Sequence, residues 1–222
     1  MIARNIFGAR LVHSLAWSCE NGSVAKMTFS AVLLAGGESR RMGRDKATIV
    51  FHGRPLWQRQ LQILRDLGPE KIFISARKLP SWLPFGAELL LDEPPFRGPL
   101  SGLTIALSSI QTSHLAVLAV DMPFMTSKQM QVLCRHAIRG CGAVPVLEGR
   151  SEPLAAIYPR EAAAHFSAAL AGNDFSLQPL VRNLVQADKV RLVTVAAEEQ
   201  DFYRSVNEPA DFQGETASEP SS

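Results

Sequence analysis

The chain has 222 residues, 46% hydrophobic and 20% charged, a composition typical of a globular protein rather than a disordered one. The formal net charge of +2 argues against a general nucleic-acid-binding surface, and no apolar run approaches the roughly 20 residues that cross a bilayer. Its three cysteines form no CxxC pair and no even-numbered disulfide framework, so we expect a cytoplasmic protein with neither nucleic acid nor membrane as partner.

Both ends of the chain differ from its middle. Residues 1–27 lack the sustained apolar core and the small-residue cleavage site of a secretory signal, and we expect them to be a disordered extension. The polar residues 214–222 are expected to be a disordered tail. Because residues 28–213 contain no internal repeat and no visible linker, we predict a single domain there.

Short apolar runs alternate with segments of helical periodicity along this domain. The predicted strands are 31–34, 48–51, 71–76, 88–91, 114–120, 142–147, 153–158 and 190–195. The predicted helices are 55–67, a segment ending near 109, 126–139, 160–170 and 177–185. Because strand and helix alternate through about Met125, we predict an α/β protein with three layers, α/β/α, around a mainly parallel twisted sheet.

The segment 33–46, LLAGGESRRMGRDK, combines a strand end, two adjacent glycines and four cations. The glycines let the backbone turn sharply and let an anion approach the amides, while the cations neutralise charge. The pattern indicates a loop that wraps a polyphosphate, with a basic surface turn as the alternative. It is not a Walker loop, because five residues separate Gly37 from Gly43 and Arg44-Asp45 follows; the dinucleotide fingerprint is excluded because no Gly-x-Gly occurs.

Two further strand ends carry carboxylates. Asp92 follows the strand 88–91 and precedes the glycine-rich start of a helix at 98–102, a geometry that contacts an anion or a ribose. Asp121 follows the most apolar strand, where a doubly wound sheet places its ligands. Since Mg²⁺ takes only one or two protein carboxylates and keeps several waters, Asp121 is a candidate ligand, and an ordinary turn residue is the alternative.

The segment 33–46 resembles the signature LAGGxSxRMGxDK of the molybdenum cofactor guanylyltransferases. The matching residues are Leu34-Ala35-Gly36-Gly37, Ser39, Arg41-Met42-Gly43 and Asp45-Lys46. Three later blocks are similar to segments of that family and follow in its order: Asp92 with 97–102, then 120–123, then 206–211. The resemblance covers about residues 30–212. It implies a Rossmann-like nucleotidyltransferase fold and transfer of GMP from Mg-GTP to the terminal phosphate of molybdopterin, bare or molybdenum-loaded, with release of pyrophosphate.

The resemblance also implies the residues of the site. Catalysis is expected from three charged residues, Lys46, Arg41 and Asp121. Mg²⁺ is expected to bind Asp121 and, as a second ligand, Asn207. GTP is expected to contact Leu34, Ala35, Gly36, Gly37, Lys46, Asp92 and Asp121, and Arg77 is a further candidate at a position where the chain departs from the family. The expected protein partner is a molybdoenzyme or its chaperone, which receives the product from a monomeric enzyme.

Two stretches depart from the family pattern. An Asn-x-Asn pair is frequent in the family after the second strand, whereas this chain has Ser75-Ala76-Arg77, whose arginine could reach guanine or ribose. The segment 172–176, on the pterin side, has no basic residue, so no residue is assigned to the molybdopterin phosphate.

Three other functions are compatible with parts of the pattern. Related cytidylyl enzymes usually carry Ala-Ala-Gly where residues 35–37 are Ala-Gly-Gly, which favours GTP here. Sugar-phosphate nucleotidyltransferases usually have a Gly-x-Gly-x-Arg pattern that is missing from this segment. A binding-only protein that hands over a cofactor would not need both Lys46 and Asp121.

Overall fold

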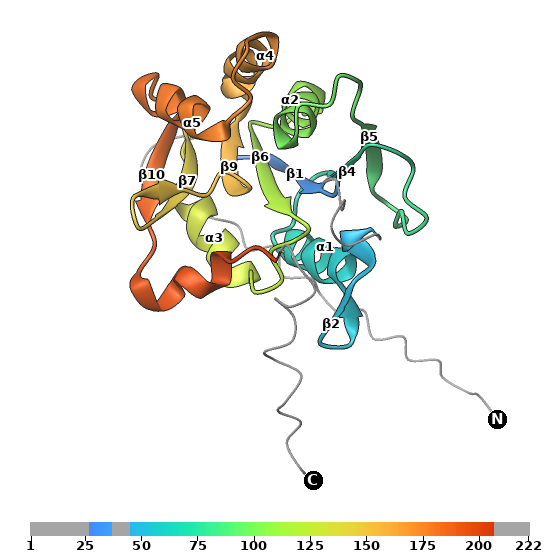
Figure 1. The fold of residues 1–222 in the computed structure, drawn as a ribbon. Coiled ribbons are helices and arrows are strands. Elements are labelled where there is room, and N and C mark those ends of the chain that lie inside the picture. Colours follow the sequence, from blue (N-terminus) through green and yellow to red (C-terminus); the bar gives the residue numbers. More distant parts are fainter. Residues whose placement is uncertain (1–26, 37–44, 207–222) are drawn as a thin grey trace, which may run out of the picture.

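The computed structural model describes residues 27–36 and 45–206 (Figure 1). The strands are β1 (Phe29–Leu34), β2 (Val50–Phe51), β3 (Arg54–Pro55), β4 (Ile72–Ala76), β5 (Glu88–Leu91), β6 (His114–Ala119), β7 (Gly142–Leu147), β8 (Arg150–Ser151), β9 (Ala155–Pro159) and β10 (Val190–Thr194). The helices are α1 (Leu56–Asp66), α2 (Pro99–Ser109), α3 (Ser127–His136), α4 (Ala163–Ala171) and α5 (Leu177–Gln186), with 3-10 segments η1 (Lys46–Thr48), η2 (Arg160–Ala162) and η3 (Ala197–Tyr203).

One eight-stranded sheet has the order β10-β7-β9-β6-β1-β4-β5, and β8 pairs with β7. β1 runs parallel to both β4 and β6, and β4 runs parallel to β5. β9 is antiparallel to its neighbours β6 and β7, so the sheet is mixed but mostly parallel. Because β1, β4, β5 and β6 point the same way, their carboxyl ends meet at one edge of the sheet.

Alternate residues of the central strands face two separate cores. Ala31 and Leu33 of β1 pack with the inner faces of α1 and α3, whereas Val32 and Leu34 pack with α2, α4 and α5. Figure 1 shows these helices on opposite faces of the sheet, α2, α4 and α5 at the top and α1 and α3 below. The predicted three-layer α/β/α architecture with a mainly parallel sheet is therefore confirmed.

The prediction for residues 48–51 is only partly right. Thr48 closes the 3-10 turn η1, and only Val50 and Phe51 are extended, in a hairpin with β3. His52 and Gly53 both have positive φ, at 46° and 72°, as a tight two-residue hairpin turn requires. Since Pro55 belongs to β3, helix α1 starts one residue later than predicted.

Helix α3 is shorter than the predicted 126–139. It ends at His136 because Ile138 leaves the helical path and exchanges backbone hydrogen bonds with Cys141, 2.9 Å in each direction. Gly140, with φ of 74°, makes the turn between them. Residues 1–26 of the predicted extension 1–27 and the predicted tail 214–222 lie outside the described residues, whereas Met27 is partly buried and packs against the core. Within the described part of the chain, no helix has the length and apolarity that crossing a membrane requires.

Candidate nucleotide-binding site

A cavity of about 240 Å³ opens at the sheet edge where β1, β4 and β6 end. The predicted site residues that line it are Leu34, Ala35, Gly36, Lys46, Arg77, Asp92 and Asp121. Gly37, Arg41 and Asn207, which were also predicted, lie outside the described residues. Topology explains the convergence, because parallel strands bring their carboxyl ends to a common edge.

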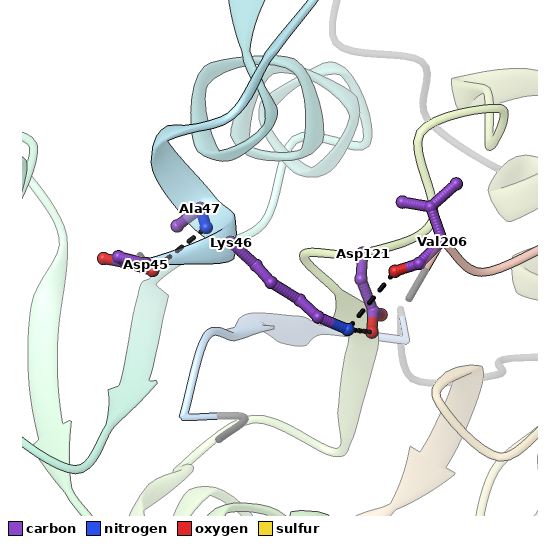
Figure 2. A network of polar contacts seen from close by, with 5 residues as sticks. All are labelled: Asp45, Lys46, Ala47, Asp121 and Val206. Carbon is purple, nitrogen blue, oxygen red and sulfur yellow. Dashed lines mark hydrogen bonds and ion pairs between the residues drawn. The ribbon is translucent and has the colours of Figure 1, made fainter. Parts of the chain in front are cut away.

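Three distant segments meet at the ammonium group of Lys46 (Figure 2). Lys46 Nζ lies 3.2 Å from Asp121 Oδ2 and donates a hydrogen bond of the same length to the carbonyl oxygen of Val206. Val206 N in turn donates to the backbone oxygen of Asp121 at 2.8 Å. The two charged side chains are 15% and 24% exposed, so the ion pair is neither dry nor fully solvated.

Asp45 fixes the backbone from which Lys46 projects. Its Oδ1 accepts a hydrogen bond from Ala47 N at 3.0 Å, which caps η1 as Figure 2 shows. Its Oδ2 accepts a second hydrogen bond, of 2.8 Å, from the indole Nε1 of Trp82. Trp82 also stacks on Trp57 of α1, with ring centroids 5.3 Å apart and planes 15° apart. A segment far along the chain thus braces the base of Lys46, a contact that no sequence signal indicated.

Asp92 forms a tightly packed wall with Ser75 and two glycines. The side chain is 8% exposed, and its Oδ1 accepts a hydrogen bond of 3.0 Å from Ser75 Oγ. A Cβ on Gly36 would lie 2.8 Å from Asp92 Oδ2, and a Cβ on Gly102 would overlap Ser75 Oγ. Burial raises the pKa of Asp92, opposed by the hydrogen bond from Ser75 and the charge of Arg77. An alanine at position 36 would therefore have to displace this carboxylate, and an alanine at position 102 would have to displace the Ser75 hydroxyl that binds it.

Two arginines near the cavity stack on phenylalanine rings. The guanidinium carbon of Arg77 lies 4.7 Å from the ring centre of Phe96, and that of Arg97 lies 4.2 Å from the ring centre of Phe175. Arg97 directly precedes Gly98 and Pro99, which line the cavity. The segment 172–176 contains no cation of its own, yet the structure brings one to it from the loop that precedes α2.

A further carboxylate, Glu152, was absent from the prediction and lies on the β8–β9 side. Glu152 Oε1 accepts a hydrogen bond from Leu154 N at 3.1 Å, and Leu154 lines the cavity. Burial raises the pKa of Glu152, and the negative charge of Asp121 raises it further, against the opposing Leu154 hydrogen bond and Arg150 charge. The two carboxylates therefore influence each other electrostatically.

The oxygens around Lys46 Nζ have the chemistry of a cation site. Asp121 Oδ2 and the Val206 carbonyl are hard oxygen donors that converge on one positive group, as they would on Mg²⁺. No cluster of three His, Cys, Asp or Glu side chains with metal-binding geometry occurs among the described residues. These residues fit a cation that takes few protein ligands and fills its shell with phosphate oxygens and water.

The model of the MobA-like NTP transferase domain family matches residues 31–204. The chain belongs to this family. A probable molybdenum cofactor guanylyltransferase from Opitutus terrae is 39% identical over 185 residues, which cover 82% of this chain and 92% of that protein. A molybdenum cofactor guanylyltransferase from Pseudomonas putida is 31% identical over 161 residues, covering 71% and 84% of the two chains.

Solved structures agree with this family at the level of the fold. The molybdopterin-guanine dinucleotide biosynthesis protein A of Archaeoglobus fulgidus superposes with a TM-score of 0.64 at 21% identity, covering 82% of this chain and 94% of that one. The 2-C-methyl-D-erythritol 4-phosphate cytidylyltransferase of Thermus thermophilus gives 0.59 at 20% identity, with the same two coverages. The resemblance read from the sequence is thus confirmed: the chain is a nucleotidyltransferase of the MobA-like family, with that family's fold.

Proposed function

We propose that the protein transfers GMP from Mg-GTP to the terminal phosphate of molybdopterin, bare or molybdenum-loaded. An acceptor phosphate oxygen attacks the α-phosphorus of GTP, the bond between the α-phosphorus and its bridging oxygen breaks, and pyrophosphate leaves. The product is molybdopterin guanine dinucleotide. The observation that carries the proposal is the meeting of Lys46, from the signature segment, with Asp121 at one cavity, in a chain 39% identical to a probable molybdenum cofactor guanylyltransferase.

Catalysis of this reaction rests on charge neutralisation and alignment, because nucleophile and leaving group are both anionic. In our proposal Lys46 and Arg41 neutralise the triphosphate, and the backbone of residues 34–37 approaches it closely. Support for a close approach comes from Gly36, where the cavity wall has no room for a Cβ. Asp92 and Arg77, on the same wall, are proposed to contact the guanine or ribose of GTP.

Mg²⁺ is the proposed cofactor, held by Asp121 with Asn207 as a second ligand. The convergence of Asp121 Oδ2 and the Val206 carbonyl supports this, because Val206 directly precedes Asn207 in the chain. A bound Mg²⁺ would stabilise the charge that develops on the reacting phosphates. Asp121 itself supplies the negative charge that attracts the cation and, through its backbone oxygen, anchors the Val206 segment.

Arg97 is our candidate for the acceptor side of the cavity. It is only partly buried and lies beside Gly98 and Pro99, and among the described residues its guanidinium has an aromatic ring but no carboxylate as partner. An arginine so placed has donors left for a phosphate. The proposal further includes a monomeric, cytoplasmic enzyme that passes its product to a molybdoenzyme or its chaperone.

The proposal is tested by paired incubations of the full chain with Mg²⁺ and molybdopterin, one with GTP and one with CTP. Dinucleotide products are read by mass spectrometry, and an Asp121→Ala variant is the control for contaminating activity. A guanine product with little cytosine product is expected. A cytosine product alone would overturn the choice of GTP as the donor. The absence of product with either nucleotide would overturn the choice of molybdopterin as the acceptor.

A further inference from the structure

We propose that the ammonium group of Lys46 occupies the divalent-cation position while the nucleotide site is empty, and that the triphosphate of GTP draws it away. The cation then binds together with the nucleotide and not before it. This inference rests on the proposed function, since it assigns an order of binding to the same site. It gives Lys46 a second role, besides that of neutralising phosphate.

The geometry identifies Lys46 Nζ as a stand-in for a cation. Asp121 Oδ2 and the Val206 carbonyl oxygen come from segments far apart in the sequence, yet both lie 3.2 Å from this one nitrogen (Figure 2). A carboxylate and a backbone carbonyl are donors that Mg²⁺ and Mn²⁺ prefer. The point where they converge holds one cation at a time, because a second positive charge there would repel the first.

The surrounding charges explain why an ammonium would remain there. The carboxylate of Asp121 is opposite in charge to the ammonium and attracts it from 3.2 Å away. Since the ion pair is only partly exposed, solvent screens it less than it would a surface pair.

The attachment of Lys46 lets its end move while its base stays fixed. The backbone is held by the Asp45 cap and by the buried side chain of Ala47, whereas the ammonium sits on a flexible four-carbon stem. Triphosphate oxygens entering the cavity compete with Asp121 for this ammonium. When it moves to them, Asp121 Oδ2 and the Val206 carbonyl become available to the divalent cation.

The test measures Mn²⁺ binding to the full chain without nucleotide, by the EPR signal of free Mn²⁺. The Lys46→Met variant removes the ammonium and keeps an unbranched side chain. Lys71→Met is the matched control, because Lys71 pairs with Glu88 at 2.8 Å but both side chains are 57% exposed. We expect Lys46→Met to bind Mn²⁺ at least about tenfold tighter than the wild type, within the usual range of coupling between sites. Lys71→Met should match the wild type.

A double variant, Lys46→Met with Asp121→Asn, should lose the Mn²⁺ affinity that Lys46→Met gains. That loss would show that the gained affinity depends on the Asp121 carboxylate. Equal Mn²⁺ affinity of wild type and Lys46→Met would overturn the inference. If thermal unfolding shows Lys46→Met to be unfolded, Lys46→Leu replaces it under the same criterion. The measurement involves no acceptor and no turnover, so its outcome is separate from the proposed function. The Lys46→Met variant can gain Mn²⁺ affinity even if the wild type makes no dinucleotide. Conversely, the wild type can make the dinucleotide even if the variant gains no Mn²⁺ affinity.

Discussion

On the β4–β5 side of the cavity, Asp92 is 8% exposed, bonded to Ser75, and enclosed by glycines at positions 36 and 102 that have no room for a Cβ. On the β6 side, Lys46 and Asp121 are partly exposed and are joined to Val206 through one ammonium group. The first wall is held by close packing, which permits few alternative positions. The second is held by polar contacts that a substrate can exchange for its own. We infer a preformed wall for the nucleoside and a wall that rearranges around the phosphates and the metal.

The largest effect is expected from Asp121→Ala, which removes the carboxylate of the second wall. Turnover should fall on the order of 10³-fold, as when a transition-state charge contact is lost. Thermal stability should change little, because the backbone bond from Val206 N to Asp121 O remains. Initial rates at saturating GTP and Mg²⁺, together with melting curves, measure both. Wild-type rates of this variant at ordinary metal concentrations would show that the metal does not bind at the end of β6.

Gly102→Ala should damage the first wall through packing alone. The new Cβ overlaps Ser75 Oγ, so the serine must rotate and give up its hydrogen bond to buried Asp92. We expect a loss of about 2 kcal/mol in the free energy of unfolding, partly offset by the better helix propensity of alanine. Chemical denaturation measures it. Gly172→Ala is the control, since a Cβ there would be 3.4 Å from its nearest neighbour; equal losses in the two variants would refute the packing argument.

Variants of Arg77 and Arg97 distinguish the GTP side of the cavity from the molybdopterin side. Arg77→Gln should raise the KM for GTP by about tenfold, and Arg97→Gln should raise the KM for molybdopterin by a similar factor, the effect of losing a charge-assisted hydrogen bond. Each variant is the control for the other, because both arginines stack on a phenylalanine in the same way. Steady-state kinetics with either substrate varied measures both constants. If both variants changed the same KM, the assignment of the two sides would be wrong.

The smallest effect is expected from Trp82→Phe, which keeps an aromatic ring on Trp57 but removes the indole donor to Asp45. Losing one exposed hydrogen bond of about 1 kcal/mol should lower kcat a few-fold by loosening the base of Lys46. Trp57→Phe alters the same ring stack without touching Asp45 and should leave kcat near the wild-type value. Equal kcat values for the two variants would show that the bond to Asp45 does not position Lys46.

Local sequence signals predicted the residues that sit at strand ends. Asp92, Asp121 and Lys46 follow apolar runs or belong to a glycine-rich loop, and the sheet topology then brings them to one cavity. The contacts from Trp82 to Asp45 and from Arg97 to Phe175 could not be predicted, because they join segments with no shared pattern. The antiparallel direction of β9 is likewise a long-range property, set by the pairing partners and not by the alternation of residues within the strand.

The most direct test of the contrast between the two walls is a crystal structure of the protein with Mg²⁺ and a GTP analogue whose α–β bridging oxygen is replaced by a methylene. We predict that the Ser75–Asp92 hydrogen bond and the close contact with Gly102 are unchanged. We also predict that Lys46 Nζ has left Asp121 for a phosphate oxygen, with Asp121 facing the metal. Lys46 still paired with Asp121 while both ligands are bound would contradict the account.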